Sequence, residues 1–149
     1  MPLHPDVLAA RDLLVHHRTD LAAARAEFSW PDPDTFNFVS DWFDGLAETQ
    51  GDATALWIVD GTGATVDRLT FTELADRSHE AAAFLQEQGI GRGDRVIVML
   101  GNQVELWEIM LGAIRLGAVL IPSTPQLAPD DLKDRVERGR AALIVTNAA

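Results

Sequence analysis

The chain has 149 residues, no cysteine and a formal net charge of −11. A compact domain of this size buries roughly 68–70% of its unfolded surface, so it can hold a core without disulfides. Without cysteine, a disulfide framework, a thiolate metal site and a cysteine nucleophile are excluded. The negative charge disfavours nucleic acid and anionic membranes as partners.

The beginning of the chain predicts no export. Residues 1–14 lack a basic stretch before a long apolar run, which a secretion signal requires. No apolar stretch reaches the roughly 18 residues of a membrane-spanning helix. We therefore expect a cytoplasmic protein without a membrane partner.

Residues 1–35 predict a helical extension followed by a proline-rich linker. A helix is expected from Pro5 to about Glu27, with a break near Thr19. Pro31 and Pro33 then prevent helix continuation and favour extended backbone.

A second helix is expected over residues 37–50, ending at Gly51. It places four apolar residues at helical spacing: Phe38, Trp42, Phe43 and Leu46. Residues 55–60 and 65–71 are β-prone runs separated by a glycine-containing turn, and they predict a hairpin.

Thr70 and Glu73 have the spacing of a capping box, which predicts a helix that begins there and ends before Gly89. Its apolar face is one stripe at a period of 3.6 residues, formed by Phe71, Leu74, Ala75, Ala81, Ala82 and Leu85. Such an amphipathic helix should pack on one side only.

The remaining chain alternates apolar strands with helices. Strands are expected over residues 95–100, 118–121 and 142–146, and helices over 103–116 and 129–138. Strands that are apolar on both faces and separated by helices indicate a parallel sheet built by right-handed crossovers. The predicted fold class is α/β: a partial doubly wound sheet with crossover helices, preceded by N-terminal helices and the hairpin.

Two features suggest missing neighbours for this sheet. The helix over residues 103–116 has few polar positions, so little of its surface should be exposed to solvent. In addition, no helix follows the last strand to cover that end of the sheet. We therefore expect a possible protein partner, or self-association, through the unfinished sheet.

Three sequence features that could suggest a cofactor or catalytic site have simpler structural explanations. The glycines at 89, 91 and 93 lie between a helix and a strand, whereas phosphate loops run from a strand into a helix. His79 and Glu80 begin a zinc-protease pattern, but Ala83 stands where the second histidine is needed. The only lysine, Lys133, follows no glycine-rich loop, so the sequence contains no recognisable phosphate-binding motif.

In an open parallel sheet, ligands bind beyond the carboxyl ends of the strands. The candidate loops are therefore residues 101–103, residues 123–128 and whatever follows Thr146. The middle loop has prolines that fix its direction and polar side chains at Ser123, Thr124 and Gln126. It is a candidate binding site, although a polar loop is often only a loop.

Four segments occur in an order that resembles the start of an AMP-forming acyl-CoA synthetase. They are FNFVSDWFD, LTFTELADRSHEAAAFLQEQGIGRGDRVIVML, ELWEIMLGAIRLGAVLIPSTPQL and ALIVTN. The resemblance covers nearly everything from about Asp20 onward, and FSWPDPDTFNF and TPQL are most similar to the medium-chain branch. The sequence departs from that pattern at Gly101, where many relatives have proline.

The resemblance implies a family that converts a carboxylic acid and ATP, with magnesium, into an acyl adenylate and then transfers the acyl group to coenzyme A. It also implies that the phosphate loop, the later carboxylates and the C-terminal lysine follow this sequence, so no catalytic or metal residue is carried over. Gln126 matches a glutamine associated with coenzyme A in the medium-chain branch. Its amide could instead merely cap the loop.

The leading hypothesis has two units. Residues 1–35 form the N-terminal extension, and residues 36–149 form the N-terminal subdomain of an adenylate-forming domain, truncated before the phosphate loop. This fragment of an acid–CoA ligase, acting on a fatty or aromatic acid, should be inactive alone and bind no cofactor tightly. The alternatives are a non-catalytic module that docks on a partner completing the sheet, and a nucleotide-binding regulatory domain.

Overall fold

The computed structural model describes residues 4–147; residues 1–3 and 148–149, the outer ends of the two predicted units, lie outside it. The helices are α1 (Pro5–His16), α2 (Leu21–Glu27), α3 (Asp44–Gln50), α4 (Phe71–Glu87), α5 (Val104–Leu116) and α6 (Pro129–Gly139), with a π-helical turn η1 (Val39–Phe43) before α3. The strands are β1 (Thr54–Val59), β2 (Thr65–Thr70), β3 (Arg95–Met99), β4 (Val119–Pro122) and β5 (Ala141–Thr146).

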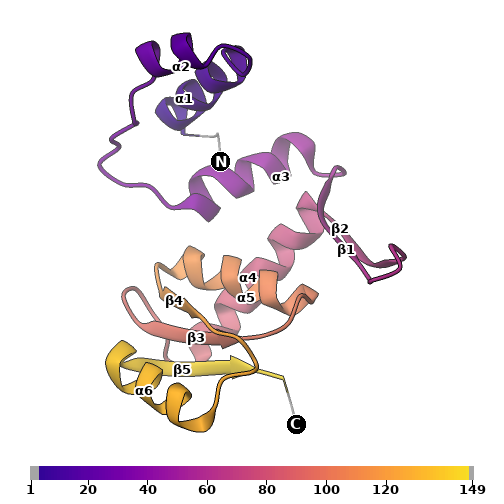
Figure 1. Cartoon of the computed structure of the whole chain (residues 1–149), viewed down its shortest axis with the longest axis vertical. Helices are drawn as coiled ribbons and strands as arrows, with labels where there is room; N and C mark the ends of the chain where they lie inside the picture. Colours follow the sequence, from indigo (N-terminus) through magenta and orange to yellow (C-terminus); the bar gives the residue numbers. More distant parts are fainter. Residues whose placement is uncertain (1–3, 148–149) are drawn as a thin grey trace.

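The last three strands form a parallel sheet in the order β4-β3-β5. From β3 the chain passes through α5 to β4 on one side, and from β4 it returns through α6 to β5 on the other side. Because right-handed crossovers in opposite directions place their helices on opposite faces, α5 and α6 cover different faces of the sheet. Figure 1 shows α4 and α5 on one face and α6 on the other. The α/β, doubly wound prediction is confirmed.

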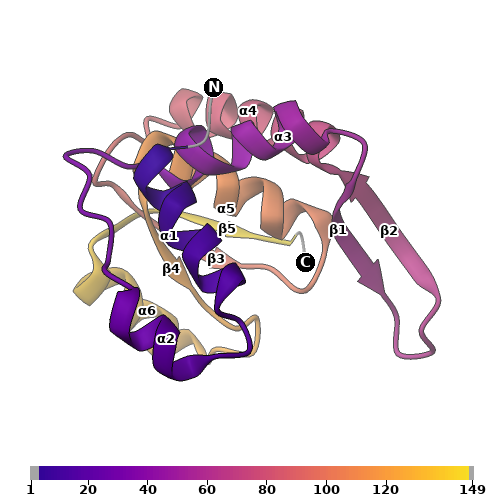
Figure 2. The same cartoon turned by 90° about the horizontal axis from the view of Figure 1, so that it is seen from above.

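The predicted hairpin is also confirmed, and it forms a separate two-stranded antiparallel sheet. Its outer face carries Trp57, whose indole N–H donates to the Thr65 hydroxyl at 3.0 Å. The Arg68 guanidinium lies 5.5 Å from the same ring. Both views show the hairpin projecting sideways from the rest of the molecule (Figures 1 and 2).

The core consists of two apolar clusters that share α4 and α5. One lies under α3 and the hairpin and is formed by Val39, Phe43, Ile58, Leu69, Leu74, Ala75, Val104 and Leu111. The other lies on the parallel sheet and is formed by Ala81, Leu85, Ile90, Val96, Val98, Leu100, Ile109 and Ala113. Gly112 allows α4 and α5 to approach closely, because a Cβ atom at this position would lie only 2.8 Å from the Ala82 backbone nitrogen.

The termini of α4 follow the sequence prediction. The Glu73 N–H donates to the Thr70 hydroxyl, and the Glu73 carboxylate accepts from the Thr70 N–H at 2.8 Å. The carboxylate accepts from both the Thr70 N–H and the Thr70 hydroxyl, and these two bonds hold the pKa of the Glu73 carboxyl below its ordinary value. At the other end Gly89 adopts a φ of 80°, a left-handed conformation that favours glycine.

The start of the second helix differs from the prediction of a regular helix over residues 37–50. The Asn37 carboxamide oxygen accepts from the Val39 N–H at 2.9 Å, so the helix begins after Asn37. The first turn is π-helical, which shifts the face that points inward. As a result Val39 and Phe43 are buried, whereas Phe38 is 46% exposed.

A bidentate ion pair connects α3 to α5. The Arg115 guanidinium donates to both carboxylate oxygens of Asp44, at 2.7 and 2.8 Å, and to the Ser78 hydroxyl at 2.8 Å. Burial of Asp44 alone would raise the pKa of its carboxyl. The hydrogen bonds and charge of Arg115 outweigh burial, so the pKa lies below the ordinary aspartate value.

The predicted break near Thr19 separates α1 from α2, where Asp20 accepts the Ala23 N–H as the cap of α2. Neither helix contains a buried residue. They contact the remaining chain through the His4 N–H, which donates to the Asp41 carbonyl at 3.1 Å, and through Arg11, 5.4 Å from the Trp42 ring. The division of the chain at residue 35 stays a prediction.

The helix α5 has the apolar surface that the sequence indicated. Within it only Glu105 and Trp107 are exposed. Among residues 4–147, no helix combines the length and the apolar character needed to cross a bilayer.

Candidate functional site

The carboxyl ends of β3, β4 and β5 form one edge of the parallel sheet. Residues 100–103 leave β3 toward one face, and residues 123–128 leave β4 toward the other. Neighbouring strands whose following loops diverge in this way define a topological switch point, where open α/β sheets bind ligands. The edge is therefore the candidate site, as the sequence predicted.

The loop over residues 123–128 is held by its own backbone bonds. The Ser123 N–H donates to the Val98 carbonyl at 2.9 Å, which anchors the loop to β3. The Gln126 N–H donates to the Thr124 hydroxyl at 3.2 Å, and the Leu127 N–H to the Thr124 carbonyl at 3.3 Å. The loop thus has a defined turn with Gln126 at its tip.

The Gln126 side chain is exposed, and no group among residues 4–147 is hydrogen-bonded to its carboxamide. A free carboxamide offers two N–H donors and an accepting oxygen. The bond that closes the turn is made by the Gln126 backbone N–H and not by the Gln126 side chain. The side chain is therefore available to a ligand at this edge.

The connection after β3 is tighter. The Gln103 N–H donates to the Gly101 carbonyl at 2.9 Å, immediately before α5 begins at Val104. The Gln103 carboxamide donates to the Glu105 carboxylate at 3.0 Å. Gly101 has a φ outside the left-handed region, and a Cβ atom there would be in ordinary contact with Gln103. The turn therefore does not require glycine at this position.

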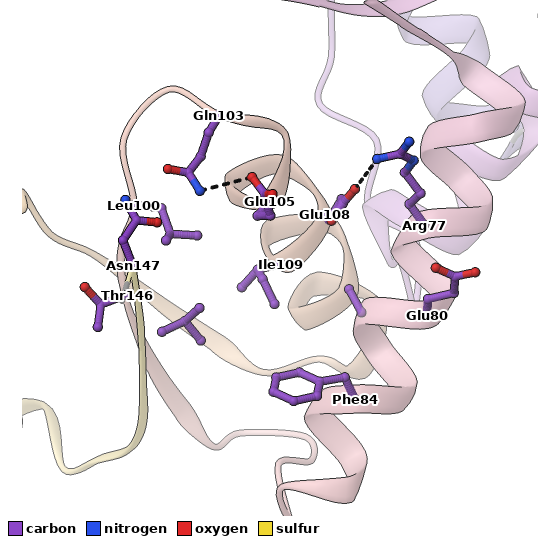
Figure 3. A pocket seen from close by; sticks show the side chains of 12 residues that line it. Arg77, Glu80, Phe84, Leu100, Gln103, Glu105, Glu108, Ile109, Thr146 and Asn147 are labelled. Atoms are coloured by element: carbon purple, nitrogen blue, oxygen red, sulfur yellow. Dashed lines mark hydrogen bonds and ion pairs between the residues drawn. The ribbon is translucent and has the colours of Figure 1, made fainter. Parts of the chain in front are cut away.

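A cavity of about 500 Å³ lies between α4, α5 and the ends of β3 and β5 (Figure 3). Its apolar lining includes Ala81, Phe84, Leu100, Ile109 and Val145, and its polar lining includes Arg77, Glu80, Gln103, Glu105, Glu108, Thr146 and Asn147. The Phe84 side chain extends from α4 toward this space (Figure 3), and it is 48% exposed.

The polar lining of this cavity is mainly acidic. The Arg77 guanidinium donates to the Glu108 carboxylate at 2.9 Å, and this bond raises the pKa of Arg77 further above its ordinary value. Glu80 and Glu105 leave the lining with an excess of negative charge. A free carboxylate or phosphate would be repelled there, because like charges at short range are unfavourable.

The loop that carries Gln126 and the cavity between α4 and α5 are separate features of this edge. Gln126 does not line the cavity, so the structure does not bring the predicted residue together with Arg77, Glu80 and Phe84. Sequence reasoning missed these three because they lie on α4, which precedes the parallel strands. Their spacing of three and four residues on one helix face was the only available signal.

The described residues do not fit a metal centre. Among residues 4–147 no three histidine, aspartate or glutamate side chains are grouped so as to hold a metal ion. The glycines at 89, 91 and 93 form the predicted helix-to-strand turn, in which the Gly91 N–H donates to Asp94 at 2.9 Å. They lie at the amino end of β3, opposite the candidate edge.

Comparison with known proteins shows to which family the chain is similar. A family model described as AMP-binding enzyme matches residues 43–149. The chain is 38% identical over 119 residues to acyl-coenzyme A synthetase ACSM2B, mitochondrial, of Homo sapiens, covering 76% of this chain and 20% of that protein. It is 32% identical over 143 residues to acyl-coenzyme A synthetase ACSM3, mitochondrial, of Rattus norvegicus, covering 92% of this chain and 24% of that protein.

A solved structure gives the same architecture. The Klebsiella oxytoca NpsA N-terminal subdomain superposes with a TM-score of 0.61 at 26% identity, covering 70% of this chain and 26% of that chain. The chain therefore spans about a fifth to a quarter of the proteins that it matches.

Proposed function

Because the chain belongs to the AMP-binding enzyme family, we propose that it forms the N-terminal part of an acyl-CoA synthetase. The complete enzyme would join a fatty or aromatic carboxylate to the AMP portion of ATP, with release of pyrophosphate. The thiol of coenzyme A would then displace AMP from the mixed anhydride to give acyl-CoA. The observation that supports this proposal is the family match over residues 43–149, which includes all three parallel strands.

The residues of this chain would contribute scaffold and binding surface rather than chemistry. Adenylation needs a metal and basic groups to hold the departing phosphates. Among residues 4–147 there is no metal-ligand group, and the sole lysine lies on the exposed surface of α6. Magnesium and the ATP phosphates do not fit here, so no reaction step is assigned to these residues. The isolated chain should therefore be inactive.

The test of inactivity is direct. Purified chain incubated with ATP, magnesium, coenzyme A and a medium-chain or aromatic acid should form no acyl-CoA above the level without protein. Release of pyrophosphate, or acyl-CoA formation, would contradict the proposal.

Gln126 is the residue of this chain that we propose to contact coenzyme A. The support is its place at the tip of a fixed loop beyond the carboxyl end of β4, with a free carboxamide. Such a group can donate to a phosphate oxygen or to a pantetheine carbonyl. No further group of this chain is assigned to coenzyme A.

A matched pair of variants tests this assignment. Titration of coenzyme A into labelled chain should shift the backbone amide resonances of residues 123–128, and Gln126→Ala should weaken this binding up to about tenfold, the value of one hydrogen bond. Gln86→Ala, an exposed change on α4, should leave it unchanged. Binding unaffected by Gln126→Ala, or no shift at residues 123–128, would remove the assignment.

A second candidate function is an interaction module that docks on a protein completing the sheet. It is favoured by one observation: among residues 4–147 no strand pairs with the outer edges of β4 and β5. Purification from its native source should then yield the chain in a stable complex. Recovery of a free monomer would count against this function.

The compartment stays a proposal. The sequence favours the cytoplasm, whereas the relatives named above are described as mitochondrial. Microscopy of a tagged chain in its source cell decides between them.

A further inference from the structure

A second cavity, of about 690 Å³, lies near the amino ends of β3 and β4, away from the candidate edge. One wall is formed by residues 34–41, which lead from the linker into η1, and the other by Arg92 and residues 115–117 at the end of α5. All its described lining residues lie between positions 34 and 117, far from both ends of the sequence. Most of them are polar, so the cavity suits a polar ligand.

Two of the charged side chains in this lining are already bonded within the fold. The Asp41 carboxylate accepts from the Asn37 N–H at 2.6 Å and from the Ser40 hydroxyl at 3.3 Å. The Arg115 guanidinium is held by both carboxylate oxygens of Asp44. These bonds keep both side chains in place as part of the cavity wall.

The other two charged side chains, Asp34 and Arg92, are exposed, and neither has a hydrogen bond or an ion pair to any of residues 4–147. The stem of Arg92 is nevertheless positioned, because its Cγ atom lies 3.2 Å from where a Cβ atom on Gly117 would stand. Gly117 has a φ of 71°, a left-handed conformation that favours glycine, so the backbone itself provides this close approach. The cavity therefore presents one free anion and one free cation, on opposite walls.

The surroundings strengthen this separation of charge. Asp34 and Thr35 also line a neighbouring cavity of about 410 Å³, together with Asp6 and Asp32. The linker side is therefore negative, whereas Arg92 makes the opposite side positive. A ligand with charge of one sign is attracted by one wall and repelled by the other, but a ligand that carries both signs can satisfy both walls at once.

We propose that this cavity binds a small zwitterion of the amino-acid class, with the ligand carboxylate on Arg92 and its ammonium group on Asp34. A guanidinium can donate two parallel hydrogen bonds to a carboxylate, and a carboxylate accepts from an ammonium group. The Thr35 hydroxyl, which has no bonded partner among residues 4–147, can accept a further ammonium hydrogen. This site goes beyond the proposed function, because neither coenzyme A nor acyl-CoA formation enters its test.

L-Lysine is a suitable probe, because its flexible chain lets the carboxylate and an ammonium group lie at more than one separation. In calorimetric titrations it should bind more tightly than cadaverine, which carries only ammonium groups, and glutarate, which carries only carboxylates. Arg92→Gln and Asp34→Asn should each weaken lysine binding by about tenfold or more, the value of a hydrogen bond between charged groups. The matched controls, Arg18→Gln and Asp52→Asn, remove exposed charges outside the cavity and should leave lysine binding unchanged.

Backbone amide resonances locate the bound probe. Lysine should shift those of residues 34–41 and 115–117 and leave those of residues 123–128 in place. All four substituted side chains are exposed, so circular dichroism should confirm that the variants fold. No detectable lysine binding, equally tight binding of cadaverine or glutarate, an affinity unaffected by Arg92→Gln or Asp34→Asn, or shifts confined to residues 123–128 would each overturn the proposal.

Discussion

The region from α4 to β5 and the arm formed by α1 and α2 both contain helices rich in alanine and leucine, yet they are held in different ways. In the first, Leu85, Val96 and Ile97 have no exposed surface. The arm contains no buried residue, and Leu14, Val15 and Leu21 are 44%, 53% and 66% exposed. Figure 1 shows the arm at the opposite end of the molecule from the parallel sheet.

The difference shows that helix-forming composition does not decide whether a helix contributes to the core. α4 has one apolar stripe that matches the sheet and α5, and burial of that stripe removes apolar surface from water. The arm instead depends on a few contacts near η1, made by His4 and Arg11. We therefore expect core substitutions to unfold the protein and arm substitutions to release only the arm.

Leu85→Ala should have the largest effect. Its side chain is fully buried in the cluster on the parallel sheet, and removing it should lower the free energy of unfolding by about 2–5 kcal/mol. The matched change Leu14→Ala in α1 removes the same atoms from an exposed position and should cost less than about 0.5 kcal/mol. Urea denaturation followed by circular dichroism measures both, and similar losses would contradict the comparison.

Arg115→Leu should have an intermediate effect, because it leaves Asp44 without its charged partner where α3 meets α5. We expect a loss of about 1–3 kcal/mol in the free energy of unfolding at neutral pH.

The same pair predicts a pH dependence. The pKa of Asp44 is lower in the folded chain than in the unfolded chain, so its contribution is complete above about pH 4 and is lost as the pH falls through the folded-state value. Asp44→Asn should therefore be less stable than the native chain at pH 7, and the difference should narrow on acidification. A constant difference down to the acid transition would exclude this ion pair as the cause.

Arg11→Leu should have the smallest effect, because the Arg11–Trp42 contact is partly exposed and is worth about 0.5–1 kcal/mol. Amide hydrogen exchange should accelerate in α1 and α2 and stay unchanged in α5. Arg18→Leu, which lies between the two helices, is the control. Faster exchange throughout the chain would show that the arm is part of the main cooperative unit.

The local signals of the sequence were sufficient for most elements. The capping box at Thr70, the turn glycine at Gly89 and the alternation of apolar strands with helices each located an element correctly. The π-helical start of the second helix was not predictable from periodicity, because it depends on bonds from Asn37 that also reach the Ile114 carbonyl, at 2.7 Å. Phe38, which the periodicity grouped with Phe43, is consequently 46% exposed, whereas Phe43 is buried.

The candidate site was predictable only in part. The loop with Gln126 follows directly from a strand, and strand order alone places it at the ligand-binding edge. The cavity is different, because Arg77, Glu80 and Phe84 come from a helix that precedes the sheet in the chain. Nothing in their local sequence indicates that they face the ends of β3 and β5.

The sequence by itself determined the class of the fold, the approximate boundaries of most elements and the resemblance to adenylate-forming enzymes, because these depend on periodicity, caps and motifs that are local in the chain. The tertiary structure decided which helix faces became core and which apolar side chains stayed exposed. Those outcomes depend on contacts between distant residues, such as Arg115 with Asp44 and α4 with β5, whose geometry no local pattern specifies.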